Sequence, residues 1–476
     1  MSKFEKNLAQ GNVVKQLLLF SAPVLLSNLI QSLYSVVDMI VVGQFAGPIS
    51  MSGVNIGSQV SFLITNMVFG LTVGATVLIG QYLGAGKRDL LKETIGTLFS
   101  TLGILAVVLT VLMIAVTEPL LTLIQTPIES FAEAKSYFFV TMLGTIFIFA
   151  YNALSAVMRG MGDSKNPLIF VAIACFVNIV LDLVLVAKLQ MGAQGAAIAT
   201  VVSQAISVIL CIIYLRKNDF VFDFNLTSFK IKKERLKMLL KIGIPTSVQN
   251  VATSLSFLFL TTLVNSLGVM ESAAVGAVGK INTFAILPAA AISSSVSAMG
   301  AQNLGAGEEK RAVKTTFVGI IMACVISVIV FIIVSIWPDA CLRIFSDDEE
   351  MIAKGVEYMK SFKFDYVTVP FLFCFNGLFI GAGHTTFSLI NNAMSAILIR
   401  IPVSYLFGMV MKMGLFGVGL GAPFASGISA IVALIFLLSG KWKKNKIVEN
   451  TGQLEIDPYL VYNRADHIVG SALFCI

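Results

Sequence analysis

The chain has 476 residues, of which 57% are hydrophobic and only 12% are charged, and its net charge is +7. Soluble globular proteins carry roughly a quarter charged residues, so this composition excludes an ordinary soluble domain. The mean hydropathy is +0.89, and apolar runs long enough to cross a bilayer recur from one end of the chain to the other. Composition therefore predicts an all-α membrane protein that crosses the bilayer many times.

Glycine, proline and charged residues divide the chain into twelve predicted spans. In chain order they are 14–42, 53–82, 92–115, 132–158, 167–187, 193–215, 237–266, 274–303, 312–336, 352–379, 386–411 and 415–440. The first apolar run is too long for the core of a signal peptide, so we expect it to remain as a helix. Several spans exceed the ~20 residues that a bilayer requires, which favours tilted helices or helices that extend beyond the lipid.

The basic residues are concentrated in alternate connections. They lie at the N-terminus and at 87–88, 159–165, 216–241, 310–311 and 441–446, whereas the connections at 118–129 and 347–350 are acidic. The positive-inside rule then predicts a multi-pass protein of the cell membrane with both termini in the cytoplasm. This orientation accounts for the positive charge, so we do not expect a nucleic acid as a partner.

The sequence of the first half recurs in the second half. "GQYLGAG" (80–86) returns as "AQNLGAG" (301–307), "MGAQGAA" (191–197) as "MGLFGVG" (413–419), and "PVLLSN" (23–28) as "PTSVQN" (245–250). The near-constant offset of 221–222 residues indicates two parallel repeats of six spans, an arrangement common in transporters. The predicted parts are an N-lobe (1–217, helices 1–6), a cytoplasmic connector (218–236), a C-lobe (237–445, helices 7–12) and a cytoplasmic tail (446–476).

The repeated LGAG motifs occur where a span meets a basic connection. Glycine at such a position can adopt the left-handed conformation that ends a helix, so we interpret these motifs as helix caps. No phosphate-binding loop follows a predicted strand. We therefore expect no bound cofactor and no use of ATP, and an energy source that is an ion gradient.

Few ionisable residues interrupt the predicted spans. They are Asp38, Asp182, Asp365, Lys280 and Arg400. A charged side chain at the centre of a bilayer costs at least ~2.5–3.5 kcal/mol, so each is a candidate functional residue.

The first half places several polar residues at one depth. Asp38 and Asp182 lie at similar distances from the outer ends of their spans, and Asn178 lies one helical turn before Asp182. Tyr137 and Thr200 lie about as deep on neighbouring spans. Two carboxyl groups in one poorly solvated pocket cannot both stay charged, so we expect the group to bind a proton or a cation such as Na⁺. The alternative is a set of hydrogen bonds that only holds the helices together.

A substrate cavity should lie beside this group. Ser27, Gln31, Tyr34 and Asp38 follow one face of the first span. The candidates for cavity residues are Gln31, Tyr34, Gln204, Gln249, Asn250, Asp365 and Arg400. In the second half, Lys280, Asp365 and Arg400 lie at comparable depths, which predicts an ion pair of Asp365 with one of the two basic residues.

Several longer motifs resemble the multidrug and toxic compound extrusion (MATE) family over residues of about 10–445. They are "APVLLSNLIQSLYSVVDMIVVGQFAG" (22–47), "GQYLGAG" (80–86), "MRGMGDSKNP" (158–167), "NIVLD" (178–182) and "MGAQGAAIAT" (191–200). The resemblance implies twelve helices in two pseudo-symmetric six-helix lobes and cation-driven export of organic, often cationic, compounds. We expect a monomer whose partners are small organic substrates and membrane lipid.

The pairing of two acids in the first half is similar to the DinF-like branch of that family. The resemblance implies that Asp38, Tyr137, Asn178, Asp182 and Thr200 form the proton or cation site. If the cation is Na⁺, its ligands would be Asp38, Asn178, Asp182 and Thr200. It also implies a role for Pro23 in bending the first helix. The chain departs from the NorM-like branch, because 245–256 contains Gln249 and Asn250 but no acid.

Three other functions compete with ion-coupled export. A flippase of lipid-linked sugars would favour more basic cavity residues than Lys280 and Arg400. A channel gives no reason for two titratable acids in one lobe. An enzyme would need a catalytic constellation, yet the two histidines are His384, in a predicted loop, and His467, in the tail. We therefore predict a transporter rather than an enzyme.

Overall fold

The computed structural model describes residues 5–218, 220–443 and 447. Most of the predicted tail, 446–476, lies outside these residues. The described chain contains helices and no strands. Ten helices are long and apolar enough to cross a membrane, and two bent helix pairs raise the number to twelve if each pair is one span.

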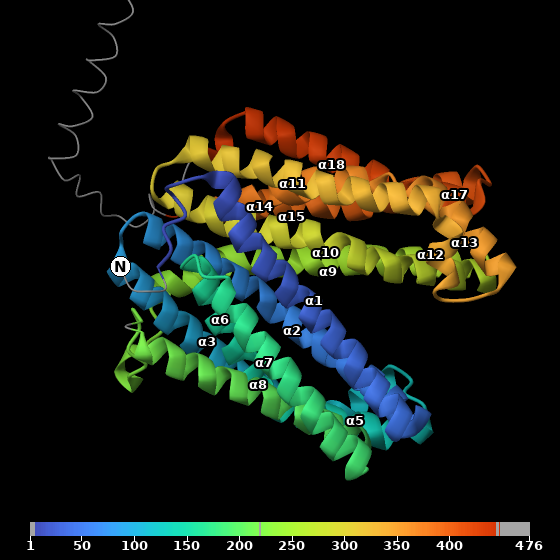
Figure 1. Cartoon of the computed structure of the whole chain (residues 1–476), viewed down its shortest axis with the longest axis horizontal. Helices are drawn as coiled ribbons and strands as arrows, with labels where there is room; N and C mark the ends of the chain where they lie inside the picture. Colours follow the sequence, from blue (N-terminus) through green and yellow to red (C-terminus); the bar gives the residue numbers. More distant parts are fainter. Residues whose placement is uncertain (1–4, 219, 444–446, 448–476) are drawn as a thin grey trace, which may run out of the picture.

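Most helices follow one another with short connections, and residues 218–232 form a longer link between α8 and α9 (Figure 1). They are α1 (Val13–Phe45), α2 (Gly47–Gly84), α3 (Arg88–Ala115), α4 (Thr117–Leu123), α5 (Ile128–Leu143), α6 (Thr145–Gly160), α7 (Lys165–Asp182) with the π-helical η1 (Leu183–Lys188), and α8 (Gly192–Lys217). The second half contains α9 (Lys233–Asn265), α10 (Val269–Gly305), α11 (Glu309–Ile336), α12 (Pro338–Arg343), α13 (Glu349–Phe362), α14 (Asp365–Gly381), α15 (Thr385–Ala393), η3 (Met394–Arg400), α16 (Ile401–Tyr405), η4 (Leu406–Val410), α17 (Gly414–Gly419) and α18 (Gly421–Leu438). Short 3-10 turns occur at η2 (Leu226–Ser228) and η5 (Lys441–Lys443).

The two predicted spans at 132–158 and 352–379 are each bent. The chain bends by 51° between α5 and α6 and by 49° between α13 and α14. At the first bend, a Cβ on Gly144 would collide with the side chain of Val201 in α8. A contact with a neighbouring helix therefore lies at this bend. The hydropathy of one span contains no information about contacts with other helices, so it could not predict the bend.

The internal repeat extends to backbone conformation. Residues with positive φ recur at offsets of 221 or 222 in the pairs Gly47/Gly268, Gly86/Gly307, Gly162/Gly383, Gln190/Lys412 and Gly192/Gly414. Gly86 and Gly307 directly follow the C-caps of α2 and α10, which confirms the predicted glycine caps. The two halves thus share local geometry even where their side chains differ.

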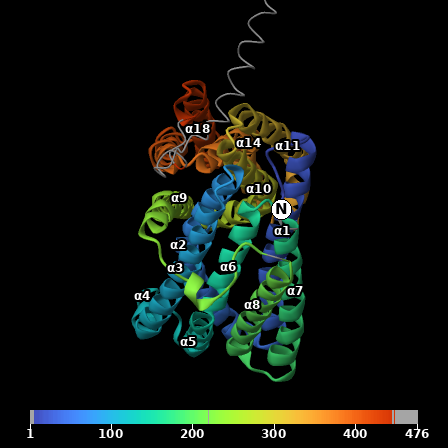
Figure 2. The same ribbon diagram turned by 90° about the vertical axis from the view of Figure 1, so that its left-hand side faces the viewer.

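The first helix of each half crosses from one half of the molecule to the other. Before Pro23, Leu17 and Phe20 of α1 pack with Ile292 and Phe375 of the second half. After the proline, Val41 and Val42 of α1 pack with Ala193 and Ala196 of the first half. The helices of the two halves form two groups, and α1 and α2 lie between them (Figures 1 and 2).

Helix α9 makes the reciprocal crossing. Leu239 and Ile242, which precede Pro245, belong to the core of the first half, whereas Leu260 and Leu263 belong to the core of the second half. The proline inside each helix therefore lies near the position where the helix changes partners. This exchange of helical segments couples the two halves.

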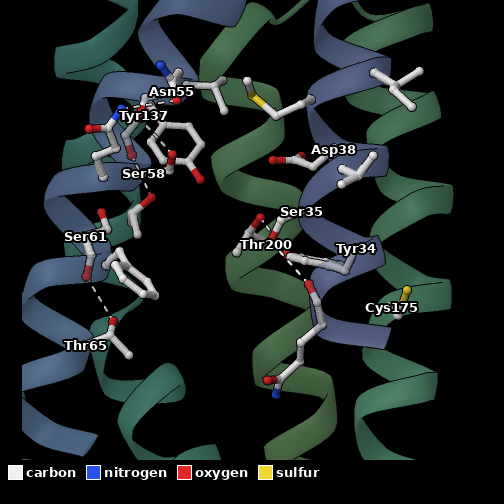
Figure 3. Close-up of a pocket in the computed structure, with 18 of the residues that line it drawn as sticks. Tyr34, Ser35, Asp38, Asn55, Ser58, Ser61, Thr65, Tyr137, Cys175 and Thr200 are labelled. Carbon is white, nitrogen blue, oxygen red and sulfur yellow. Dashed lines mark hydrogen bonds between the residues drawn. The ribbon is translucent and has the colours of Figure 1, made fainter. Parts of the chain in front are cut away.

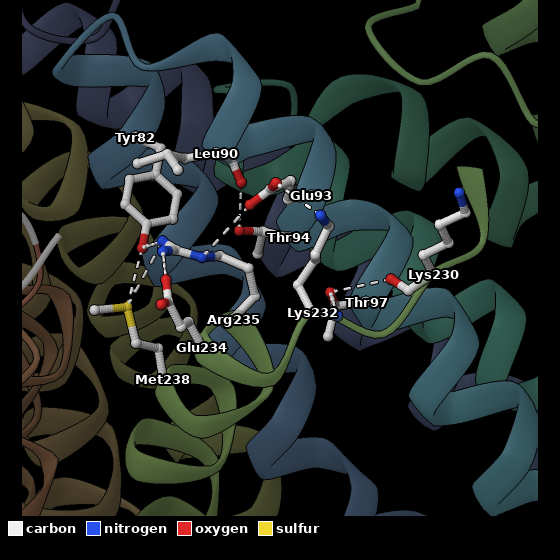
Figure 4. Close-up of polar contacts among 10 residues, drawn as sticks. All are labelled: Tyr82, Leu90, Glu93, Thr94, Thr97, Lys230, Lys232, Glu234, Arg235 and Met238. Atoms are coloured by element: carbon white, nitrogen blue, oxygen red, sulfur yellow. Dashed lines mark hydrogen bonds and ion pairs between the residues drawn. The ribbon is translucent and has the colours of Figure 1, made fainter. Parts of the chain in front are cut away.

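Polar contacts fasten the start of α9 to the first half (Figure 4). The buried Arg235 donates to Tyr82 Oη at 2.6 Å and lies 3.8 Å from a carboxylate oxygen of Glu93. The backbone N–H of Lys232 donates to Thr97 Oγ1 at 3.1 Å. The segment before Pro245 is thus anchored to α2 and α3 by an ion pair and by hydrogen bonds.

We call the end of the molecule where α2 meets α3 and α10 meets α11 the basic end. The helices are tightly packed there. A Cβ on Gly84 would collide with the carbonyl oxygen of Gln302, and a Cβ on Gly305 would collide with the carbonyl oxygen of Gln81. Gln302 Nε2 also donates to the carbonyl oxygen of Gly160 at 3.0 Å. The LGAG motifs therefore allow two backbones to approach closely, a role that the cap interpretation missed.

We expect Gly84→Ala and Gly305→Ala each to destabilise the protein by about 1–3 kcal/mol, because the new methyl group has no space. Thermal unfolding of the detergent-purified protein checks this. The matched control is Gly103→Ala in α3, since a Cβ at Gly103 has no neighbour within 4 Å. Equal stability of Gly84→Ala and Gly103→Ala would show that the close approach at Gly84 tolerates a methyl group.

Candidate functional site

Two buried carboxyl groups form the centre of the candidate site. Asp38 of α1 is 6% exposed and Asp182 of α7 is 0% exposed. The two groups lie within hydrogen-bonding reach of each other. In the described part of the chain, no donor reaches Asp38 Oδ1 or Asp182 Oδ1. Two carboxylates at this range repel each other, so a shared proton or a cation must neutralise one of them.

Asp182 stands at a change in helical geometry. It is the last residue of α7 and precedes the π-helical segment η1. The second half contains a π-helical segment at the equivalent place, η4. A π-bulge widens the helical ladder locally and is frequent at functional sites. The local geometry that presents Asp182 is therefore part of the repeat, although the acid is not.

Asn178 links Asp182 to two neighbouring helices. In the amide orientation that satisfies both of its ends, Asn178 Nδ2 donates to Asp182 Oδ2 at 2.9 Å. Its oxygen accepts from the backbone N–H of Thr200 at 3.3 Å and from Tyr34 Oη at 3.3 Å. Tyr34 Oη also lies 2.8 Å from Thr200 Oγ1, and its single proton serves either that oxygen or Asn178. The sequence correctly grouped Asn178 and Thr200 with the acids, and it missed that Tyr34 joins them.

Tyr137 of α5 completes the group. Its side chain is buried beside Val41 of α1 and Val54 of α2. A Cβ on Gly57 would come within 2.6 Å of the Tyr137 ring, so this glycine makes room for the tyrosine. All five residues predicted for ion coupling thus gather in the first half, while their role in coupling stays a prediction.

A cavity of about 1110 Å³ adjoins the carboxyl pair. It has the size of a site for drug-sized compounds. Of the predicted cavity residues, Gln31, Tyr34 and Gln204 line it, as do Asp38 and Thr200. The side chains that line its opposite wall belong to α2 and face Asp38 and Tyr34 across the cavity (Figure 3).

The polar wall on α2 was missed by the sequence reasoning, which considered mainly charged residues inside the spans. Its members are Asn55, Ser58, Gln59, Ser61 and Thr65. Their spacing of three and four residues puts them along one helical face, and this periodicity was available in the sequence.

The predicted ion pair of Asp365 is wrong for this conformation. Within the described residues, no ion pair joins Asp365 to Arg400 or Lys280. Asp365 Oδ1 instead accepts from Ser426 Oγ at 2.6 Å. The guanidinium of Arg400 lies over the ring of Phe257, 4.7 Å from its centroid. Similar depth along the helices therefore did not bring these side chains into contact, and Asp365 and Arg400 have other partners.

The remaining candidates lie elsewhere. Gln249 and Asn250 of α9, like Asp365 and Arg400, are outside the described lining of the large cavity. Pro23 lies inside α1, and its carbonyl oxygen accepts from Ser27 Oγ at 2.8 Å.

The structural features together define a class of protein. Repeated six-helix units, helices that cross between the halves, and a large cavity with one buried acid in its wall and a second behind it are features of a membrane transporter. Comparison with known proteins then identifies the family. A family model described as MatE matches residues 23–184 and again residues 245–406, one match for each repeat. The chain belongs to the MATE family, and it is a membrane transporter rather than an enzyme.

Known relatives support this assignment over nearly the full chain. The probable multidrug resistance protein YpnP of Bacillus subtilis is 31% identical over 445 residues, which is 92% of this chain and 98% of the relative. The probable multidrug resistance protein NorM of Thermotoga maritima is 26% identical over 443 residues, 91% of this chain and 94% of the relative. A solved structure of a MOP-superfamily transporter from Pyrococcus furiosus has a TM-score of 0.86 at 23% identity, covering 93% of this chain and 100% of the other.

These findings confirm the predicted family and the predicted fold class of two six-helix lobes. The first half, α1–α8, is called the N-lobe from here on, and the second half, α9–α18, the C-lobe. The DinF-like branch and the lobe boundaries 1–217, 218–236 and 237–445 stay predictions.

We expect Asn178→Leu to lower stability by about 1–3 kcal/mol, because it removes the hydrogen bonds that Asn178 makes with partners on three helices and leaves Asp182 Oδ2 without its donor. The control is Asn152→Leu, since Asn152 Nδ2 donates only to the carbonyl oxygen of Ile148 on its own helix. Thermal unfolding of both purified variants compares them. Equal losses would mean that the Asn178 contacts contribute nothing particular.

Proposed function

We propose that the protein exports organic compounds in exchange for protons, and that the Asp38–Asp182 pair binds the coupling proton. The observation that carries this proposal is the position of the pair. Asp38 lines the cavity, whereas Asp182 is buried behind it within hydrogen-bonding reach. Asp38 is therefore accessible to a substrate. Asp182 gains or loses a proton according to the charge on Asp38.

A protonated carboxyl pair agrees with the amide orientation that satisfies both ends of Asn178. Its oxygen accepts from the Thr200 N–H and faces Tyr34 Oη, and its nitrogen faces Asp182. Na⁺ requires oxygen ligands, so the amide would have to turn and give up these contacts before it joined the coordination of a cation. Bound Na⁺ would otherwise be held by Asp38, Asp182 and the Thr200 hydroxyl, and it would supply only charge neutralisation.

The proposed cycle follows from electrostatics and from the positive-inside rule. That rule places the basic end in the cytoplasm, so the cavity would face the outside in this conformation. A proton from outside neutralises the pair, which removes an attraction for a cationic compound and releases it. The neutral pair also lowers the cost of closing the cavity. The lobes then reopen toward the cytoplasm, where the proton leaves and a new compound binds.

Alternating access would use the crossing helices. The tight contact of Gly84 with Gln302 and of Gly305 with Gln81 joins α2 to α10 at the basic end. Opening there requires these contacts to separate and the segments before Pro23 and Pro245 to move. Inward movement of one positive charge supplies ~2.3 kcal/mol per 100 mV, enough for roughly a fifty-fold gradient of a neutral compound at one-for-one exchange.

The nearest alternative, a flippase of lipid-linked sugars, has less support. Such a substrate carries phosphate groups, and Lys280 is the single basic residue in the described lining of the cavity.

We expect Asp38→Asn and Asp182→Asn each to abolish proton-driven uphill efflux, because neither variant retains a pair of acids that shares a proton. Asn178→Ala and Thr200→Ala should reduce efflux less, since the acids remain. The measurement is dye efflux from proteoliposomes under proton and Na⁺ gradients imposed separately.

Asp223→Asn in the connector between α8 and α9 is the control, because Asp223 lies away from the cavity and should leave efflux unchanged. Uphill efflux by Asp38→Asn at the wild-type rate would exclude the pair as the coupling site. Efflux driven by Na⁺ alone would replace the proton with Na⁺ as the coupling ion.

A further inference from the structure

Lys280 occupies an unusual place for a basic residue. It lies on α10, eleven residues after the helix begins at Val269. At 1.5 Å per residue this is ~16 Å along the helix, about half the thickness of a ~30 Å hydrocarbon core. Its side chain is exposed and lines the large cavity. An ionisable side chain at this depth is costly, which marks it as a functional residue.

No structural role accounts for Lys280. Among the described residues it forms no ion pair. The helix around it leaves space, because a Cβ on Gly276 or on Gly279 would meet nothing within 4 Å. Lys354, by comparison, pairs with Glu271 at 2.8 Å near the start of the same helix. A lysine without a partner at this depth suits a ligand that brings its own negative charge.

Two hollow spaces meet at this lysine. Besides the large cavity, Lys280 lines a recess of about 470 Å³ next to Ala273, Gly276 and Ala277 of α10. Phe345, Ser346, Asp348 and Met351 line the same recess, which therefore also contains an acid. A compound in the cavity can therefore reach the ammonium group and place an apolar part beside small and apolar side chains.

The large cavity contains one side chain of each charge among its described residues. In the described lining, the charged side chains are Asp38, from the N-lobe, and Lys280, from the C-lobe. The equivalent repeat positions do not carry these charges, since the counterpart of Asp38 is Leu260 and that of Lys280 is Gln59 or Ser58. The cavity is thus polarised, with one charge of each sign on opposite lobes.

We propose that Lys280 is a substrate-binding residue that recognises a carboxylate, so that the transported compounds include zwitterions. The Lys280 ammonium group binds the carboxylate by a charge-assisted hydrogen bond, and the cationic part of the compound lies toward Asp38. This inference rests on the proposed function, since it names the class of compound that the same cavity exports. Protonation of the acid pair then weakens one end of the compound's attachment, while Lys280 keeps the other end until the lobes move.

The test uses two dyes that differ by a single group. Rhodamine B is a zwitterion with a carboxylate, and its ethyl ester is a cation of nearly the same shape. Binding of each dye to the purified protein is measured by fluorescence anisotropy, and efflux of each dye is measured in proteoliposomes. The proteins are the wild type, Lys280→Gln, Lys280→Arg and the control Lys314→Gln, whose exposed lysine on α11 lies outside both hollow spaces.

We expect Lys280→Gln to weaken binding of rhodamine B at least about tenfold, as loss of a charge-assisted hydrogen bond should. Binding of the ester should change less than about twofold. Lys280→Arg should keep most of the affinity for rhodamine B, and Lys314→Gln should behave as the wild type. The wild type itself should bind rhodamine B at least as tightly as the ester.

Other outcomes overturn the inference. Unchanged binding of rhodamine B to Lys280→Gln, or an equal loss for both dyes, would exclude carboxylate recognition by Lys280. If Lys280→Gln does not fold, a wild-type preference for the ester of more than about tenfold has the same consequence. The proposed function fails separately, if the wild type exports neither dye under any gradient although the two dyes still bind.

Discussion

The structure depends most on two carboxyl groups that cannot both be charged at the distance at which they lie. Asp38 and Asp182 come from different helices, and both are almost completely buried. Each lacks a protein donor at one oxygen, so a proton or a cation must compensate for one negative charge. The surrounding residues maintain this requirement, since Asn178 holds Asp182 while Thr200 and Tyr34 hold Asn178. The same constraint is the basis for the proposal that the site responds to an ion gradient.

The helices that carry this site also connect the two lobes. Asp38 lies beyond Pro23 on α1, in the segment that packs on the N-lobe, and the segment before Pro23 packs on the C-lobe. A change of charge at Asp38 therefore acts on a helix that belongs to both lobes. α9 crosses in the opposite direction but presents Leu260 at the equivalent position, so it provides the same connection without a titratable group. The two lobes are thus similar in fold, and the buried carboxyl pair lies in one of them.

The sequence predicted the class, the repeat and the buried acids, because ionisable residues inside apolar spans are rare and costly enough to stand out. Hydroxyl and amide side chains carry a weaker signal, so the polar wall of α2 was missed. The bend at Gly144 and the close approach at Gly84 depend on residues distant in sequence, Val201 and Gln302. The pairing of Asp365 was wrong for the same reason, since depth along a helix does not determine which way a side chain points.

The most direct test of this account counts protons during substrate binding. The cationic ethyl ester of rhodamine B is titrated into purified protein by calorimetry in two buffers with different ionisation enthalpies. If the Asp38–Asp182 pair shares one proton and exchanges it for a cation, the wild type should release about one proton per dye bound, and Asp38→Asn should release none. Binding to the wild type without proton release, or equal release by Asp38→Asn, would contradict the account.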